Sequence, residues 1–345
     1  MNKTQFVEQL KEGDRLDDFF LVKAARLAET RAGKPYLVLE VADRSGEIGG
    51  PIWDQAEEFQ GICQVGSFVH LSGQLQSYQG KLQLKIDGVR AVERHEVDLA
   101  DFVRTCDQDR TKLARELQLL VASVRNPFLK KLLSVFFKKE PMWQRFQDSP
   151  AAKGIHHAYV GGLLEHSLSV AQIADGLAEH YSGVDRSLLL AGALLHDIGK
   201  VEELAMELAL IDYTPQGRLK GHLVMGSEMV AEAASNIRDF PAELLTQLQH
   251  LILSHHGRQE FGSPTVPMTI EAFVLSFVDD LDAKMNLMEQ LRKKIKEPGL
   301  QWTEYQRSLE RYLYLGPLES RGEEVADDPA ERRSPPMPLR QPTLF

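Results

Sequence analysis

The sequence predicts a two-domain protein in which a small five-stranded β-barrel precedes an all-α helical bundle, with a helical connector between them and a disordered tail. Three observations predict this organisation. Short alternating apolar segments run from Phe19 to about Val92, apolar residues recur at helical spacing from 97 to about 315, and the last 30 residues hold six of the sixteen prolines.

The composition is that of a folded protein. The 345 residues are 43% hydrophobic and 26% charged, with 40 Lys and Arg against 50 Asp and Glu. The net charge of −10 argues against a protein that coats nucleic acid by bulk charge, although it does not exclude a local basic groove. No signal peptide and no apolar run of membrane-spanning length is recognisable, and the two cysteines exclude a disulfide framework, so we expect a cytoplasmic protein.

The barrel is predicted over residues 1–95. A polar lead-in of about 15 residues precedes strands expected at 19–22, 35–41, 47–53, 66–73 and 81–86, with a helical insert at 54–61. Five short strands of this spacing are typical of a Greek-key barrel that binds single-stranded nucleic acid or oligosaccharide across one face.

Binding of a single strand needs stacking aromatic rings and basic side chains. The barrel offers Tyr36, Trp53, Tyr78, Lys34, Lys81 and Lys85. Tyr78 stands in a predicted hairpin turn and is expected to be exposed. Tyr36 and Trp53 could instead belong to the barrel core, and for Trp53 we favour the core.

Helical patterns follow the barrel. Residues 96–149 are interpreted as a helical connector in which Pro127 marks a break, and residues 150–315 as the helical domain. Its helices are expected at 161–181, 187–196, 223–235, 241–255, 268–290 and 302–313, and the pattern at 208–213 is ambiguous. Residues 316–345 have the composition of a disordered tail.

Nine of the eleven histidines lie between His156 and His256, and they define the candidate site. Five elements recur about one helix and one loop apart, namely His166, His196-Asp197, His222, His255-His256 and Asp279. Each can therefore stand on a different helix and face the bundle interior. A single buried histidine is most often a core residue, but this order on successive helices is unlikely to arise by chance.

The donor set contains nitrogen and oxygen without sulfur, which suits Mn, Fe, Co or Zn better than Ca or Mg. Two carboxylates with four or five imidazoles exceed the needs of one ion. We interpret them as a two-metal centre bridged by Asp197, a design that clamps a phosphoryl oxygen and generates a hydroxide nucleophile. Phosphodiester hydrolysis fits this chemistry.

Specific strings strengthen this interpretation. The segment His196-Asp197-Ile198-Gly199-Lys200 resembles the signature of HD-domain phosphohydrolases. Together with the segments 150–166 and 254–257 and an OB-type barrel, it resembles the YhaM family of 3′→5′ exoribonucleases over roughly residues 15–315.

The resemblance implies the ligands of both ions. His166, His196, Asp197 and Asp279 would hold one ion, and Asp197, His222, His255 and His256 would hold the second. The family pattern Ala-Asp-x-x-Asp-Ala selects Asp279 over Asp280, with Val278 in place of the first alanine. We expect two divalent ions, Mn²⁺ first, with Fe, Co or Mg as alternatives.

Three further residues near the motifs are candidates. Lys200 would neutralise charge on a bound phosphate, if the helix continues past Gly199, or would be an ordinary solvated lysine. His156 and His157 would contact nucleic acid or support the metal ligands.

The predicted function is metal-dependent exonucleolytic hydrolysis of single-stranded RNA or DNA that releases nucleoside 5′-monophosphates, and the 3′→5′ polarity comes only from the resemblance. One alternative is an HD phosphohydrolase of mononucleotides or cyclic dinucleotides with a regulatory barrel. Another is a nucleic-acid-binding accessory protein in replication or repair.

The chain ends in Gln341-Pro342-Thr343-Leu344-Phe345, which resembles the sliding-clamp-binding pentapeptide Gln-Leu-x-Leu-Phe except at Pro342. Gln341 would bond at a pocket rim while Leu344 and Phe345 fill it, and the tail would act as a tether. The alternative is an ordinary tail. A sliding clamp is therefore a candidate partner, and it would shift the substrate toward DNA.

Overall fold

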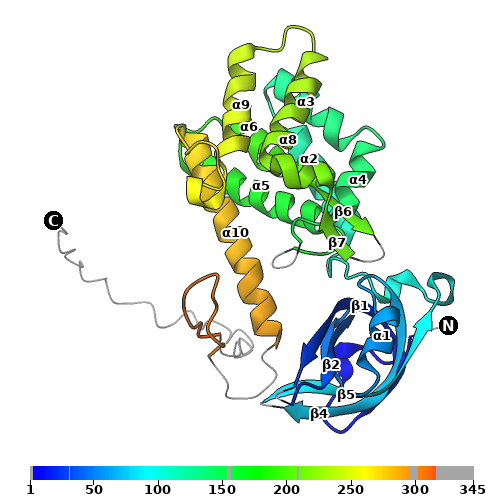
Figure 1. The fold of residues 1–345 in the computed structure, drawn as a ribbon. Helices are drawn as coiled ribbons and strands as arrows, with labels where there is room; N and C mark the ends of the chain where they lie inside the picture. The colour runs from blue at the N-terminus through cyan, green and yellow to red at the C-terminus, as the bar shows by residue number, and fades with distance from the viewer. Residues whose placement is uncertain are drawn as a thin grey trace, which may run out of the picture. The chain divides into compact units, whose positions relative to one another are not determined.

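A computed structural model describes residues 3–30, 32–78, 80–153, 157–207, 210–294 and 302–315 (Figure 1). The chain divides into two compact units, Met1–Leu287 and Met288–Phe345. His156, Gln341, Leu344 and Phe345, which the sequence singled out, lie outside the described residues, and so does the side chain of Lys81.

The N-terminal part is a five-stranded antiparallel sheet in the order β3-β2-β1-β4-β5. The strands are β1 Arg15–Glu29, β2 Pro35–Asp43, β3 Gly46–Ile52, β4 Phe68–Tyr78 and β5 Lys81–Val92, with helix α1 Ala56–Ile62 between β3 and β4. The first half of β1 pairs with β4 and its second half with β2, and a bulge near Val22 lies between the two halves. This shared strand bends the sheet toward closure.

Closure is completed where β3 approaches β5. A Cβ atom at Gly50 would lie 1.7 Å from the carbonyl oxygen of Leu84, so only glycine allows these two backbones to meet. The interior is filled by alternating apolar side chains that include Leu16, Phe20, Leu37 and Leu71. The predicted barrel is therefore present, with longer strands than the sequence pattern suggested.

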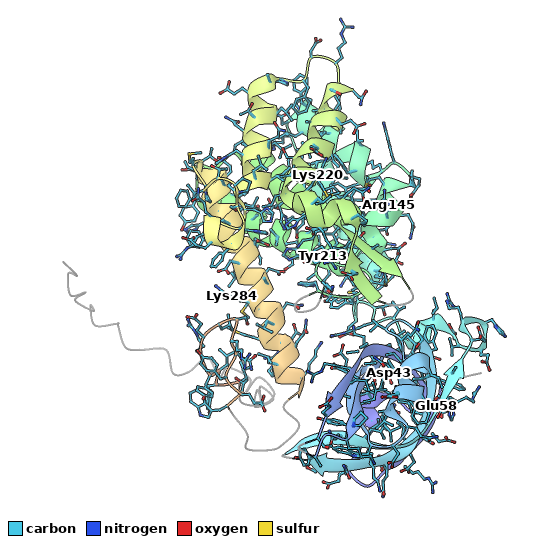
Figure 2. The ribbon with its side chains drawn as sticks, in the orientation of Figure 1. Asp43, Glu58, Arg145, Tyr213, Lys220 and Lys284 are labelled. Carbon is cyan, nitrogen blue, oxygen red and sulfur yellow. The ribbon has the colours of Figure 1, made fainter. Side chains whose placement is uncertain are left out.

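The segment that precedes β1 is attached to the barrel by two buried carboxylates. Asp18 accepts hydrogen bonds from the backbone N–H groups of Thr4 and Gln5 at 2.7 and 2.6 Å. Asp43, labelled in Figure 2, accepts from the backbone N–H of Val7 and lies 3.4 Å from the ammonium group of Lys3. These contacts give the polar lead-in a defined position.

The helical part contains more than the predicted domain. Its elements are α2 Arg110–Ser123, α3 Pro127–Phe137, α4 Met142–Asp148, α5 Gly162–His180, α6 Arg186–Leu195, α7 Lys200–Glu203, α8 Pro215–Ser235, α9 Ala242–Ser254 and α10 Ile270–Lys294. Short 3-10 helices stand at Arg94–Glu96, Leu99–Asp101 and Gln259–Phe261, and another at Val7–Gln9 precedes β1.

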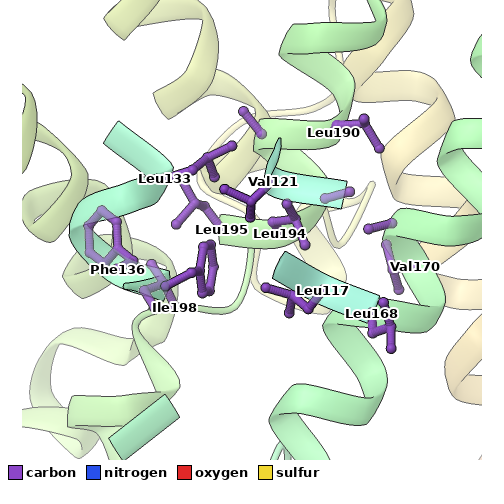
Figure 3. Packing of buried hydrophobic residues seen from close by; sticks show 14 of the residues in the cluster. Leu117, Val121, Leu133, Phe136, Leu168, Val170, Leu190, Leu194, Leu195 and Ile198 are labelled. Atoms are coloured by element: carbon purple, nitrogen blue, oxygen red, sulfur yellow. The ribbon is translucent and has the colours of Figure 1, made fainter. Parts of the chain in front are cut away.

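One hydrophobic core runs through these helices (Figure 3). Leu117 and Val121 of α2 and Phe136 of α3 pack in the same cluster as Leu168 and Leu194 of the predicted helical domain. Residues 110–148 therefore contribute to the helical core and are not a separate connector. Asn126 caps α3 and Pro127 begins it, which explains the break between α2 and α3.

Two segments of the helical part contain no α-helix within the described residues, one left ambiguous by the sequence and one predicted to be helical. The ambiguous region forms a small antiparallel hairpin of β6 Leu204–Glu207 and β7 Leu210–Tyr213. The helix expected at 302–313 is absent from the described residues 302–315, where isolated bridges join Trp302 to Tyr314 and Gln306 to Arg311. Edge-to-face packing of Trp302 on Tyr314 favours this pairing over a helix.

No helix within the described ranges is both long and apolar enough to serve as a membrane span.

The replacement Asp18→Ala should destabilise the barrel by about 2–3 kcal/mol, because it leaves backbone donors of Thr4, Gln5 and Phe19 without their acceptor. Burial opposes the charge on Asp18, but these hydrogen bonds hold its pKa below the ordinary value. The stabilisation is therefore present above about pH 4 and is lost as the pH falls through the lowered pKa. Native-state hydrogen exchange of β1 and β4 amides measures the difference.

Asp17→Ala is the matched control, because the Asp17 carboxylate is mostly exposed and lies 3.8 Å from His70. Equal protection of β1 amides in the Asp18 and Asp17 variants at neutral pH would contradict the anchoring role of Asp18.

Candidate metal centre

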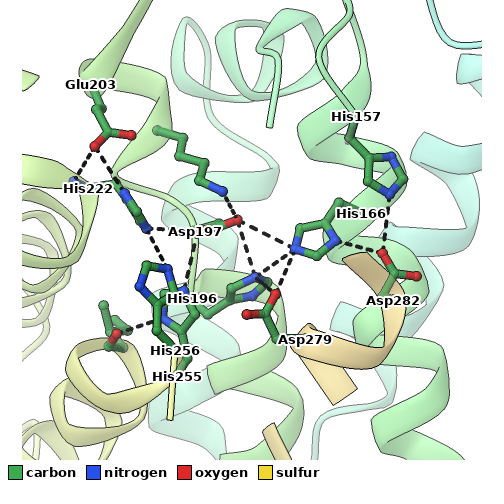
Figure 4. Close-up of polar contacts among 12 residues, drawn as sticks. His157, His166, His196, Asp197, Glu203, His222, His255, His256, Asp279 and Asp282 are labelled. Atoms are coloured by element: carbon green, nitrogen blue, oxygen red, sulfur yellow. Dashed lines mark hydrogen bonds and ion pairs between the residues drawn. The ribbon is translucent and has the colours of Figure 1, made fainter. Parts of the chain in front are cut away.

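Five structural elements deliver one candidate ligand or one pair of ligands each (Figure 4). His166 lies on α5, His222 on α8 and Asp279 on α10. The pairs His196-Asp197 and His255-His256 directly follow the last turns of α6 and α9. All seven side chains converge in one histidine–aspartate cluster, as the spacing predicted.

The first half of the cluster surrounds Oδ2 of Asp197. The Nε2 atoms of His166 and His196 lie 3.5 and 3.4 Å from it. Oδ1 of Asp279 lies 3.1 Å from Nε2 of His166 and 3.6 Å from Nε2 of His196. The neighbouring Asp280 points away and pairs with Lys284, so the structure places Asp279, not Asp280, in the cluster.

The second half surrounds the other oxygen of the same carboxylate. Nε2 of His222 lies 3.4 Å and Nε2 of His255 lies 3.6 Å from Oδ1 of Asp197. Nε2 of His256 lies 3.3 Å from Nε2 of His222. Asp197 thus has one carboxylate oxygen in each half of the cluster, which is the arrangement of a bridging ligand.

Each imidazole is oriented by an acceptor at its other nitrogen. The Nδ1 atoms of the five histidines lie 2.7–3.0 Å from the carboxylate of Asp282 for His166, that of Glu203 for His222, and the carbonyl oxygens of Ala193, Ile252 and Phe261 for His196, His255 and His256. With Nδ1–H donating to these acceptors, each Nε2 presents its lone pair to the cluster. Such support is usual for metal-ligating histidines.

The donor spacing fits bound cations. Ligand atoms at about 2.1 Å from one ion lie roughly 3.0 Å apart in octahedral and 3.4 Å apart in tetrahedral coordination. The Nε2 atoms of His166 and His196 are 3.1 Å apart, so their lone pairs repel unless a proton or a cation lies between them. Asp197 Oδ1 is buried, and no hydrogen-bond donor from the described part of the chain satisfies it.

The electrostatics of the cluster favour the same conclusion. Burial would raise the pKa of Asp197, but Lys200 and His196 hold it well below its usual range. Burial opposes a charge on His196, yet Asp197 and Asp279 raise its pKa to about 10. Burial lowers the pKa of His255 to about 4, so this imidazole is neutral and ready to act as a ligand. Cation binding would displace the proton from His196.

A close helix contact sets the position of His222. A Cβ atom at Gly199 would lie 2.1 Å from the carbonyl oxygen of His222 and 2.7 Å from the backbone nitrogen of Gly226. The turn after Asp197 therefore lies directly against α8. Just before His222, α8 is kinked at Gly221, where φ is 73°. The kink lets both the backbone N–H and Nδ1 of His222 reach Glu203, at 2.9 and 3.0 Å.

Lys200 faces the cluster rather than solvent. Its ammonium nitrogen lies 2.6 Å from Oδ2 of Asp197, and its side chain is largely buried. The helix does not continue past Gly199, because α6 ends at Leu195 and α7 begins at Lys200, so the contact forms across the turn 196–199.

Sequence reasoning did not identify the carboxylates that support the ligands. Asp282, which stands one helical turn after Asp279, binds Nδ1 of His166 at 2.7 Å and Nε2 of His157 at 3.2 Å. The spacing of three residues on α10 was the available signal for Asp282. Glu203 carried no comparable signal.

His157 was predicted to contact nucleic acid or to support a ligand. Its side chain is 3% exposed and is enclosed by Asp282, Tyr159 and Glu165. The buried side chain of His157 is therefore not placed to contact nucleic acid. It supports Asp282, which supports His166.

The barrel carries an aromatic groove. Tyr36, Trp53, Tyr78 and Leu82 line a pocket of about 580 Å³ on the side of β2 and β3. The rings of Tyr36 and Trp53 stack with centroids 4.8 Å apart. Trp53 is half exposed, so its expected place in the core is wrong: it follows the last residue of β3 and lies on Tyr36.

The groove is aromatic rather than basic. Lys85 is exposed on β5 but is not among the residues that line the groove, and Lys34 pairs with Asp54. Glu40 and Glu47 do line it. Contacts with a strand in this groove would therefore rely on base stacking more than on phosphate charge.

Family models match both the helical part and the barrel of this chain. Residues 163–284 match the HD domain family, and residues 22–92 match the OB-fold nucleic acid binding domain family. A domain of replication protein A from Methanococcus maripaludis aligns with 27% of this chain and 97% of its own length, at 22% identity and a TM-score of 0.23.

Curated relatives match over most of their length. The chain is 35% identical to the 3′-5′ exoribonuclease YhaM of Geobacillus sp. over 89% of this chain and 93% of that protein. It is 35% identical to the protein of the same name from Bacillus subtilis over 88% and 96%, and 36% identical to that of Shouchella clausii over 83% and 89%.

The replacement Gly199→Ala should separate the turn after Asp197 from α8 and displace His222. Because backbone atoms occupy the site of the new methyl group, we expect a loss of about 1–3 kcal/mol in unfolding free energy. Thermal unfolding should show a midpoint lowered by several degrees.

Gly176→Ala on α5 is the control, since a Cβ atom there meets no atom of the described chain within 4 Å and alanine favours a helix. If the Gly199 variant were as stable as the Gly176 variant, the close contact would not set the position of α8.

Proposed function

Since this chain belongs to the YhaM family of 3′-5′ exoribonucleases, we propose that it removes nucleotides from the 3′ end of single-stranded RNA by two-metal hydrolysis of the terminal phosphodiester bond. The expected products are nucleoside 5′-monophosphates. The observation that carries the two-metal proposal is the position of Asp197, whose two carboxylate oxygens each face a separate group of imidazole nitrogens.

In this proposal the two halves of the cluster hold one divalent ion each. His166, His196 and Asp279 complete the first half, and His222, His255 and His256 the second, with Asp197 shared. Bound divalent ions would supply an activated water as nucleophile and would stabilise negative charge on the phosphoryl group. The nitrogen and oxygen donors favour Mn²⁺, with Fe, Co or Mg as alternatives.

The side chains around the ions have separate tasks. Asp197 fixes the distance between the two halves, and the carboxylates of Asp282 and Glu203 keep the His166 and His222 rings in the tautomer that leaves Nε2 free. Lys200 carries a positive charge beside Asp197, where it would offset the charge that develops on the phosphate.

The barrel would hold the strand by stacking bases on aromatic rings. Tyr36 and Trp53 stack on each other, and Tyr78 lines the same groove. Every base offers a π face, so this binding mode accepts any base sequence and would also bind single-stranded DNA. The sliding-clamp partner proposed for Gln341, Leu344 and Phe345 remains a prediction from the sequence alone.

A gel assay with 5′-labelled single-stranded RNA and DNA of one sequence tests the reaction. With Mn²⁺ we expect a ladder that shortens from the 3′ end, and with EDTA an intact substrate. Asp197→Ala should lower the rate by at least 10³-fold, because it removes the shared ligand of both ions.

Asp280→Ala is the matched control. Asp280 is the neighbour of Asp279 on α10, but its carboxylate pairs with Lys284 outside the cluster. Activity of the Asp197 variant within tenfold of the control would refute the two-metal assignment. Hydrolysis of cyclic dinucleotides with no shortening of RNA would instead favour the small-nucleotide alternative.

The replacement Asp282→Asn should weaken Mn²⁺ binding about 10–100-fold, because a neutral amide oxygen is a weaker acceptor for the His166 and His157 rings than the charged Oδ2 that both of them contact. Titration calorimetry measures the affinity directly, without reference to turnover. We expect one of the two binding steps to weaken and the other to be unchanged, since His222, His255 and His256 have different supports. Equal weakening of both steps would contradict separate support of the two halves.

A further inference from the structure

Helix α10 carries an exposed apolar stripe on the side opposite to the metal centre. Ala272, Leu275 and Val278 of α10 are buried in the helical core, and Asp279 and Asp282 face the histidines. On the other side Phe273, Phe277, Leu281 and Met285 are 54, 69, 47 and 55% exposed. Ile270 extends the stripe toward the start of the helix and is also more than half exposed.

This stripe is larger than scattered surface residues would explain. Four of its members follow one another at intervals of four residues and so form a single ridge along the helix. Contiguous apolar patches of this kind on soluble proteins mark sites of association. Two phenylalanines, a leucine, a methionine and an isoleucine offer several hundred Å² of apolar surface, on the order of the roughly 800 Å² that each partner buries in a stable complex.

The spacing of the ridge makes it complementary to itself. Phe277 and Leu281 are equidistant from position 279, and so are Phe273 and Met285. When two copies of α10 cross in antiparallel fashion about this point, Phe277 of each copy meets Leu281 of the other. A two-fold interface has this property, because the same patch must serve both partners.

The charged residues beside the stripe are compatible with burial. Lys284, which projects from α10 in Figure 2, is paired with Asp280 on the same helix. This pair brings no net charge to the edge of the interface. Ridges at intervals of four residues also pack in the commonest class of helix crossing.

We propose that the protein associates with a second copy of itself through the Phe273–Met285 face of α10, in an antiparallel two-fold contact. The partner helix covers the apolar stripe, and each copy of α10 then has one face in the dimer and the other in its own metal centre. The proposal does not depend on the reaction at that centre.

Light scattering coupled to gel filtration of the full chain tests the association. We expect the native protein to elute as an assembly of chains, and Phe277→Glu to lower its mass at least twofold at the same concentration. Leu219→Glu is the control, because Leu219 is 88% exposed on α8 and should leave the mass unchanged. A native protein that is monomeric at tens of micromolar, or an assembly that Phe277→Glu leaves intact, would overturn the proposal.

Disulfide trapping tests the register. Phe277→Cys and Leu281→Cys chains, mixed and oxidised, should give a covalent dimer in several-fold higher yield than either variant alone. In this register position 277 of one copy faces position 281 of the other. The two 277 positions are therefore offset from each other by four residues, about 6 Å along the helix axis, which places them beyond the reach of a disulfide. The native Cys63 and Cys106 are buried and do not compete. Equal yields from the single variants and the mixture would overturn the antiparallel register.

Discussion

A single buried carboxylate imposes the strongest constraint on this molecule. Asp197 is almost fully inaccessible, and an isolated charge in such a place would be prohibitively costly. The surrounding helices therefore have to deliver compensating groups to within about 4 Å of it, and they do so from five different elements. The architecture of the helical part is a solution to this requirement, because every helix that delivers a ligand also contributes apolar side chains to the common core.

The carboxylates behind the histidines determine how precisely the site is built. The rings of His196, His255 and His256 donate to backbone carbonyl oxygens in the last turn of their own helix or in the turn that follows. Their orientation therefore follows from the helix ends themselves. His166 on α5 and His222, which directly follows the kink in α8, instead depend on the carboxylates of Asp282 and Glu203.

The sequence predicted the barrel, the helical bundle and the seven clustered residues, because strand alternation and histidine spacing are local patterns that survive folding. It did not identify Asp282, although the spacing of three residues after Asp279 was a signal for it, and it could not predict Glu203 or the burial of His157, because neither has a local signature in the sequence. Trp53 was misplaced because its exposure depends on Tyr36, a neighbour in space. The segment 302–315 was misjudged for the same reason: pairing of Trp302 with Tyr314 across a turn outweighs a helical pattern.

The bond between Glu203 and His222 also closes the chain on itself. Between these two residues run β6, β7 and the first turns of α8, and both ends of this excursion are fixed at one carboxylate. A loop whose ends are held together can lengthen, shorten or change its sequence at little entropic cost to the rest of the protein. Evolution can therefore reshape the β6–β7 hairpin without disturbing the imidazoles, whereas Gly217 and Gly221 of α8 stay constrained by their fit against Glu203 and by the kink before His222.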